Sequence, residues 1–157
     1  MKVIFLDFDG VLNVIPKDWD QYGSLFHEEL VENLRYIIQN TDAVIVCSST
    51  WRLSGLQYIQ DMWKHRGYPG DVIDITPFIK TERGFVDRGY EIQQWLSENQ
   101  VENYVILDDD DDMLDEQWDN FVKCSGNITH PDCIDIGYGL TKRCTEQAIK
   151  ILNNKQK

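Results

Sequence analysis

The N-terminal segment constrains this chain most, because a strand-length apolar run, residues 3–6, leads directly into two carboxylates and a glycine. Four consecutive apolar residues bounded by Asp7 favour a fully buried strand. Asp7 and Asp9 are two positions apart, so their side chains project from the same side of an extended chain. In open α/β sheets the ends of such strands line the ligand crevice. The pattern predicts an active-site edge, although an Asp-Gly turn at Gly10 is by itself common.

Strand-length apolar runs alternate with helical patterns along the rest of the chain. Further strands are expected at residues 43–47, 72–75, 104–107 and 121–124, with a loop or short hairpin at 12–23 and a loop at 79–84. Helices are expected after N-caps at Ser24 and Ser54, from about Asp87 to residue 96, near 113–118, and from about Thr141 to Asn153. Because parallel strands need crossover connections, this order predicts an α/β fold. We expect a three-layer α/β/α sandwich with a mainly parallel, Rossmann-like sheet.

Length and composition indicate one globular domain spanning residues 1–157, since single domains cluster near about 100–150 residues. No apolar run approaches the roughly 20 residues that a membrane-spanning helix needs, and the N-terminus predicts a strand where a signal peptide would be basic and then apolar. We therefore expect a cytoplasmic protein that makes no membrane contact. Four cysteines stand singly, without a C-x-x-C pair, and are interpreted as reduced thiols: Cys47, Cys124, Cys133 and Cys144.

A formal net charge of −12 argues against a broad nucleic-acid-binding face, because such binding relies on Lys and Arg displacing counterions from phosphates. A phosphorylated ligand needs a local positive site instead. Part of the negative excess lies in one run of aspartates, residues 108–112, for which a solvated acidic loop is the simplest interpretation.

Polar side chains follow three of the predicted strands. They are Asp7 and Asp9, then Ser48 and Ser49, then Asp108 and Asp109. In a parallel sheet all of them gather at the carboxyl edge. Carboxylates brought so close would repel and raise at least one pKa unless a cation lies between them. Mg²⁺ suits this set of oxygen ligands, whereas no His or Cys cluster supports zinc.

A phosphoryl group in such a site needs a hydrogen-bond donor and a cation. Ser48 supplies the donor. Arg88, at the start of a predicted helix, is the favoured cation, because a side chain and free backbone N–H groups can hold an anion together there. Lys80 and Arg83 compete for this role, and a surface ion pair with Glu91 is the alternative interpretation of Arg88.

Four ordered motifs resemble those of the HAD-like (haloacid dehalogenase-like) phosphatases. They are residues 5–12 (Phe-Leu-Asp-Phe-Asp-Gly-Val-Leu), an apolar strand into Ser48, a basic residue at a helix start, and residues 105–109 (Val-Ile-Leu-Asp-Asp). More narrowly, residues 49–52, 88–96 and 139–141 resemble the HAD domain of Swiss army knife RNA-repair proteins.

The resemblance implies a role for each matching position. Asp7 would be the nucleophile that forms an aspartyl-phosphate, and Asp9 the acid and base. Ser48 and Arg88 would orient the transferring phosphoryl group. Two sets complete the implied site: Mg²⁺ ligands from Asp7, the Asp9 backbone carbonyl, Asp108 and Asp109, and substrate contacts from Gly10, Ser49 and Arg52. Whether Ser48 or Ser49 is the second-motif residue, and which aspartates of 108–112 bind metal, stay open.

The gaps between motifs leave no room for a large cap domain, so we expect an open site. An open site suits a phosphate on an RNA or DNA end, and a nucleotide is the smaller candidate. Trp51 and Tyr22 are candidates to stack on a base, with core packing as the alternative for Trp51. The predicted function is a Mg²⁺-dependent phosphatase. The alternatives are a receiver-like signalling domain, which would leave Asp9 unused, and a non-catalytic phosphate-binding domain.

Overall fold

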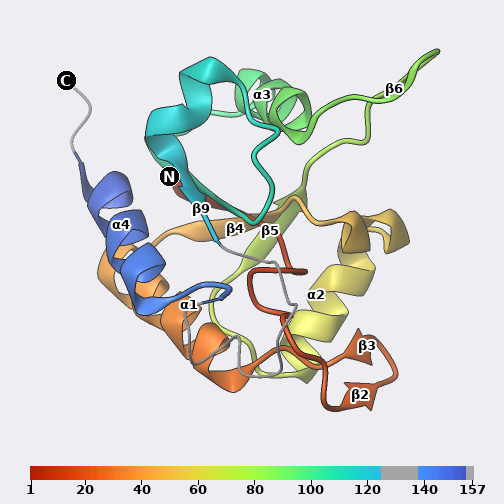
Figure 1. Ribbon diagram of the computed structural model, residues 1–157, viewed down its shortest axis with the longest axis vertical. Coiled ribbons are helices and arrows are strands. Elements are labelled where there is room, and N and C mark those ends of the chain that lie inside the picture. Colours follow the sequence, from red (N-terminus) through yellow and green to blue (C-terminus); the bar gives the residue numbers. More distant parts are fainter. Residues whose placement is uncertain (125–137, 155–157) are drawn as a thin grey trace.

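A five-stranded parallel sheet forms the centre of the computed structural model, which describes residues 1–124 and 138–154 (Figure 1). The strand order is β5-β4-β1-β8-β9. The bounds are Lys2–Leu6 for β1, Val44–Cys47 for β4, Val72–Ile75 for β5, Asn103–Asp108 for β8 and Phe121–Lys123 for β9. All four pairings are parallel, as the alternation of strands and helices predicted.

Strand register brings the ends of three strands to the same level. Leu6 at the end of β1 pairs with Cys47 of β4 on one side and with Leu107 of β8 on the other. The residues that follow are Asp7, Ser48 and Asp108. Their backbones continue the sheet, since Asp7 N–H donates to the Leu107 carbonyl and Ser48 N–H to the Leu6 carbonyl, each at 3.0 Å. The polar positions therefore emerge together at the middle of the carboxyl edge.

Helices cover both faces of the sheet (Figure 1). One face packs against α1 (Glu28–Thr41), α2 (Leu56–His65) and α4 (Lys142–Asn153). The other packs against α3 (Arg88–Glu98) and the segment that leads to the 3-10 helix η2 (Asp115–Asn120). Side chains alternate along β1 accordingly, with Ile4 and Leu6 in the first core and Val3 and Phe5 in the second. The predicted three-layer α/β/α architecture is confirmed.

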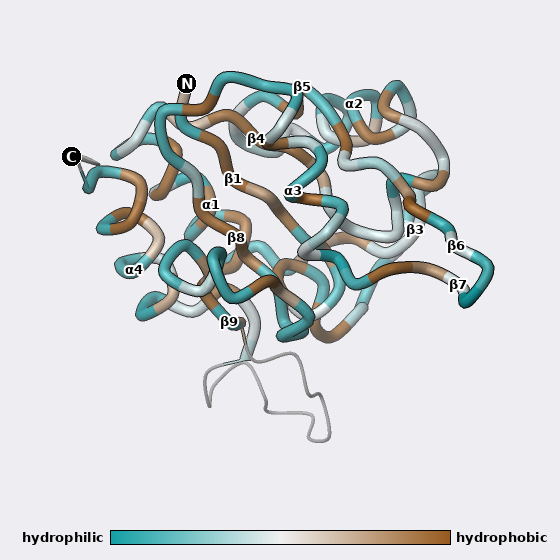
Figure 2. Tube along the Cα trace, turned by 90° about the horizontal axis from the view of Figure 1, so that it is seen from above, coloured by the Kyte–Doolittle hydropathy of each residue, from teal (hydrophilic) through white to brown (hydrophobic). Residues whose placement is uncertain are grey.

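Two short antiparallel hairpins leave the sheet. The first joins β2 (Trp19–Asp20) to β3 (Gly23–Ser24) and lies within the segment where a loop or hairpin was expected. The second joins β6 (Lys80–Thr81) to β7 (Gly84–Phe85) and projects from the body of the molecule (Figure 2). The segment 79–84 was expected to be a loop. It forms a hairpin because Gly84 takes a positive φ of 107° and the Thr81 hydroxyl bonds to the Gly84 carbonyl.

Two of the predicted helix caps are wrong. Ser24 belongs to β3, and α1 begins four residues later with His27 in the N-cap position. Ser54 ends the 3-10 helix η1 (Thr50–Ser54), and Gly55 precedes α2. The two later starts are confirmed. Asp87 precedes α3, and the Thr141 hydroxyl caps α4 by accepting from the N–H of Cys144.

The described cysteines, Cys47, Cys124 and Cys144, carry free thiols, as expected. Cys133 lies outside the described residues. Within residues 1–124 and 138–154, no helix is both long and apolar enough to cross a membrane.

Candidate active site

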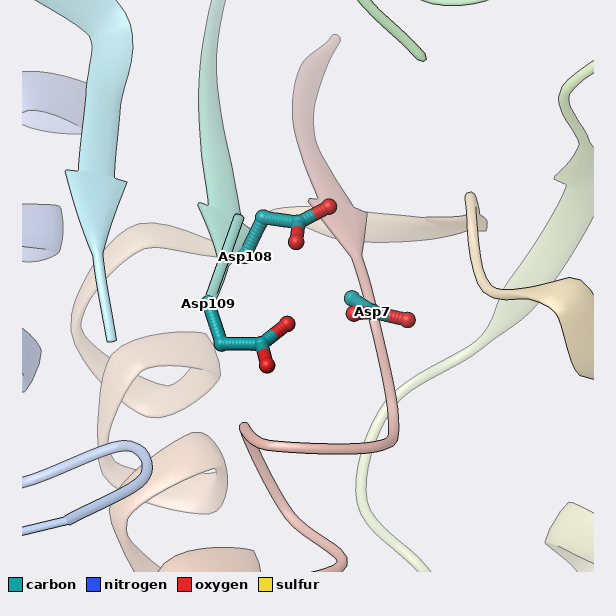
Figure 3. A group of neighbouring side chains, drawn as sticks. All are labelled: Asp7, Asp108 and Asp109. Atoms are coloured by element: carbon teal, nitrogen blue, oxygen red, sulfur yellow. The ribbon is translucent and has the colours of Figure 1, made fainter. Parts of the chain in front are cut away.

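Three carboxylates meet at the carboxyl edge of the sheet (Figure 3). One oxygen from each of Asp7, Asp108 and Asp109 lies within 4.8 Å of the others. Asp7 follows β1, whereas Asp108 ends β8 and Asp109 comes immediately after it. Asp7 and Asp108 are buried and Asp109 is half-buried. Adjacent strand ends thus converge on one point, as the sequence predicted for these three residues.

Gly10 makes room for this cluster. Its φ of 83° is a left-handed conformation that favours glycine. A Cβ atom at this position would overlap the carboxylate of Asp109. The absence of a side chain at Gly10 therefore allows the Asp109 carboxylate to lie at this position.

Burial and mutual repulsion dominate the electrostatics of the cluster. Desolvation, followed by the charge of Asp108, raises the pKa of Asp7 well above that of a free aspartate. Burial also raises the pKa of Asp108, against the opposing effect of Arg88. A divalent cation would relieve both the repulsion and the desolvation, because hard cations bind carboxylate oxygens directly. The donor set and its burial therefore fit Mg²⁺, which Asp7, Asp108 and Asp109 would hold.

Arg88 is the cation at this cluster. Its Nη1 lies 2.7 Å from Asp108 Oδ2 and 3.3 Å from Asp7 Oδ1. Burial would lower the pKa of Arg88, but the charges of Asp108 and Asp7 raise it further, so the guanidinium stays charged. The competing candidates Lys80 and Arg83 are both exposed on the β6–β7 hairpin. The alternative interpretation of Arg88 is wrong, because Glu91 pairs with a different arginine.

The other three aspartates of the acidic run, residues 110–112, make different contacts. Asp110 is exposed, and its backbone N–H donates to Asp108 Oδ1 at 3.0 Å. Asp111 lies 3.6 Å from Lys123 in an exposed ion pair. Asp112 accepts a 2.9 Å bond from the backbone N–H of Arg88, so its carboxylate holds the N-terminus of α3. Only Asp108 and Asp109 of this run belong to the described carboxylate cluster.

Ser48 and Ser49 differ in what their hydroxyls do. Both residues are fully buried. Ser49 Oγ accepts from the backbone N–H of Trp51 at 3.3 Å and caps η1. Ser48 Oγ has no hydrogen-bond partner among the described residues. Buried polar atoms are rarely left without a partner, so the hydroxyl of Ser48 is the one free to meet a ligand.

The side chain of Arg52 is buried and engaged by the protein itself. Its side chain is about 1% exposed, and its nitrogens donate to the backbone carbonyls of Ser48, Ser49, Thr76 and Pro77 and to Glu91 Oε1. The guanidinium also lies 3.7 Å from the centre of the Phe78 ring. Because its donors are taken by the protein, Arg52 fastens η1 to the segment after β5. The expectation that it contacts substrate is corrected to this structural role.

Asp9 lies apart from the described carboxylate cluster, and its side chain is exposed. Its Oδ1 accepts from Asn13 Nδ2 at 2.7 Å, and both of its oxygens accept from Trp51 Nε1 at 3.2–3.3 Å. The sequence did not identify Asn13 or Trp51 as partners of Asp9. It also did not identify Asp112 as the residue that holds α3.

Comparison with protein families matches residues 3–132 to the model described as the HAD domain in Swiss Army Knife RNA repair proteins. The chain belongs to this family. Neither the curated proteins nor the solved structures contain a match.

Membership of this HAD family indicates hydrolase chemistry. The HAD superfamily is one of phosphatase-type hydrolases that generally use Mg²⁺, and the cluster of Asp7, Asp108 and Asp109 is compatible with both properties. The parallel five-stranded sheet and the absence of a large cap among the described residues agree with a HAD fold.

Proposed function

We propose that this HAD domain is a Mg²⁺-dependent phosphomonoesterase that works through an aspartyl-phosphate on Asp7. The observation that carries the proposal is the convergence of three carboxylates, Arg88 and the unpartnered hydroxyl of Ser48 at one edge of the sheet. A nucleophile, a cation and a hydrogen-bond donor are the groups that phosphoryl transfer needs.

In the first step, a carboxylate oxygen of Asp7 attacks phosphorus, and the bond between phosphorus and the leaving-group oxygen breaks. The Asp9 carboxyl gives its proton to that oxygen, so a neutral alcohol departs. In the second step, the Asp9 carboxylate takes a proton from water as the water oxygen attacks phosphorus. The bond from phosphorus to Asp7 then breaks, which releases phosphate and restores both side chains.

Mg²⁺ bound by Asp7, Asp108 and Asp109, with the Asp9 backbone carbonyl as the further proposed ligand, supplies charge neutralisation for the phosphoryl oxygens. Arg88 offers the second positive charge. In the structure its guanidinium bridges Asp7 and Asp108, so binding of a phosphoryl group requires Arg88 to exchange a carboxylate contact for a phosphate contact. The hydroxyl of Ser48, which is buried and has no partner among the described residues, offers a hydrogen bond to the same group.

As substrate we propose a phosphorylated nucleic-acid end, with a nucleotide as the smaller candidate. The family's description supports an RNA end. The β6–β7 hairpin also supports a nucleic-acid end. It comes shortly before Arg88 in the chain and exposes Lys80, Arg83 and the ring of Phe85. Cations for phosphates and an aromatic ring for a base are typical of single-strand binding.

The experiment is a hydrolysis assay on an aryl phosphate with and without Mg²⁺, for the wild type and Asp7→Asn. We expect Mg²⁺-dependent release of phosphate by the wild type and none by the variant. Activity retained in Asp7→Asn would refute the mechanism. A substrate panel of oligonucleotides phosphorylated at either end, mononucleotides and sugar phosphates then tests the proposed class, and equal, weak rates on all of them would contradict a nucleic-acid substrate.

A further inference from the structure

The Asp9 carboxyl is held from two directions. Asn13, four residues further along the chain, donates to Oδ1 at 2.7 Å, and the indole N–H of Trp51 reaches both oxygens at 3.2–3.3 Å. An exposed carboxylate on its own exchanges rotamers on the picosecond to nanosecond timescale. Two donors on one carboxyl restrict that exchange, so the Asp9 side chain is exposed to solvent and yet confined.

The donor on Trp51 is itself fixed by packing. Its ring meets Phe8 and Phe26 edge-on, at centroid distances of 5.8 and 5.3 Å. Gly23 of the β2–β3 hairpin lies against the outer edge of the ring, where a Cβ atom would come within 3.3 Å of it. The indole therefore has little freedom to turn away from Asp9.

The backbone that carries Trp51 is anchored as well. The backbone N–H of Trp51 donates to the Ser49 hydroxyl. The next residue, Arg52, is the buried arginine that links η1 to the segment after β5. The short 3-10 helix η1 thus comes soon after Ser48, the proposed hydrogen-bond donor to the phosphoryl group. The same helix carries the indole that reaches Asp9.

We propose that Trp51 is a positioning residue that holds the Asp9 carboxyl in the orientation from which it serves the leaving-group oxygen. This inference rests on the proposed phosphatase function. Base stacking by Trp51 is disfavoured, because ring packing and the contact with Asp9 already engage it. The contact also explains why a tryptophan in an aromatic core has its polar atom at the active-site edge.

The step that depends on Asp9 is proton donation to the departing oxygen. An alkyl phosphate needs that proton, whereas dinitrophenyl phosphate releases an anion that is stable without it. Since kcat/KM covers only the steps through departure of the alcohol, it separates this role from the later attack of water. Trp51→Phe keeps an aromatic ring at this position and removes the indole N–H. We expect it to lower kcat/KM for an alkyl phosphate at least about tenfold and to leave dinitrophenyl phosphate within about twofold of wild type.

Trp63→Phe is the matched control. Trp63 packs on Phe8 and Phe26 in the same aromatic core, but its indole N–H donates to the Pro69 carbonyl at 2.8 Å. This variant should change the two substrates by the same factor. Equal effects of Trp51→Phe on both substrates, with an active wild type, overturn the positioning role alone. A wild type that hydrolyses neither substrate overturns the proposed function instead.

The contact itself has a readout that does not depend on activity. In a ¹⁵N-labelled protein, Asp9→Ala should shift the indole N–H resonance of Trp51 and speed its exchange with solvent, because the acceptor is gone. The indole resonance of Trp63 should stay in place. A Trp51 resonance that does not respond to Asp9→Ala contradicts the inference whatever the enzyme hydrolyses.

Discussion

Removal of the Arg52 guanidinium is expected to cost about 3–5 kcal/mol of unfolding free energy, the range found when one member of a buried ion pair is deleted. The structure places Arg52 at the upper end of that range. Its side chain is about 1% exposed, Glu91 is 2.9 Å away, and four backbone carbonyls accept from its nitrogens. Arg52→Met fills similar space but leaves a buried carboxylate and those carbonyls without their donor.

Urea unfolding without Mg²⁺ measures this cost. With a slope of about 2 kcal/mol per molar urea, a cost near the upper end of that range should lower the midpoint by about 2.5 M. Arg35→Met is the control, since Arg35 pairs with Glu32 on the surface of α1, and it should stay within about 0.5 kcal/mol of wild type. The double variant Arg52→Met/Glu91→Met should cost less than the sum of its single changes. A loss below about 1 kcal/mol in Arg52→Met would refute the structural role.

Three further predictions concern the site and its rim. Burial raises the pKa of Asp7 to about 8. Without metal, the contribution of protonated Asp7 to the free energy of unfolding is therefore fully present below the ordinary pKa of about 3.9, and it is lost as pH rises through about 8. Urea unfolding across that range should show the decline in wild type and less of it in Asp7→Asn or with saturating Mg²⁺; identical slopes would contradict it. Gly10→Ala should displace Asp109 and weaken Mg²⁺ binding at least about tenfold by calorimetry, because one ligand moves; unchanged affinity would exclude Asp109 as a ligand. Lys80→Ala with Arg83→Ala should raise KM for a phosphorylated oligonucleotide and flatten its salt dependence, yet spare an aryl phosphate; equal effects on both would remove the hairpin from substrate binding.

The strand ends could be predicted from the sequence because local patterns determine them. Apolar runs mark β1, β4 and β8, and parallel pairing of Leu6 with Cys47 and Leu107 then places Asp7, Ser48 and Asp108 at one level. No long-range knowledge beyond the order of strands and helices was needed. The same reasoning explains why the three-layer architecture agreed with expectation.

Contacts between distant segments could not be predicted in this way. Trp51 is 42 residues from Asp9, and Glu91 is 39 residues from Arg52, so neither pair leaves a local pattern. An arginine close after two serines resembles a phosphate ligand in sequence, and only its burial reveals another task. Ser24 failed as a helix cap for a similar reason, because its backbone pairs with Trp19 in a hairpin.

The most direct test of the central claim is detection of the phosphorylated enzyme. Wild-type protein would be mixed with Mg²⁺ and an excess of aryl phosphate, quenched in acid within milliseconds, digested and analysed by mass spectrometry. The account predicts one phosphoryl group on the peptide that contains Asp7, lost on treatment with hydroxylamine and absent from Asp7→Asn. Phosphate release at the same rate with no modified Asp7, or with the phosphoryl group on another residue, would contradict it.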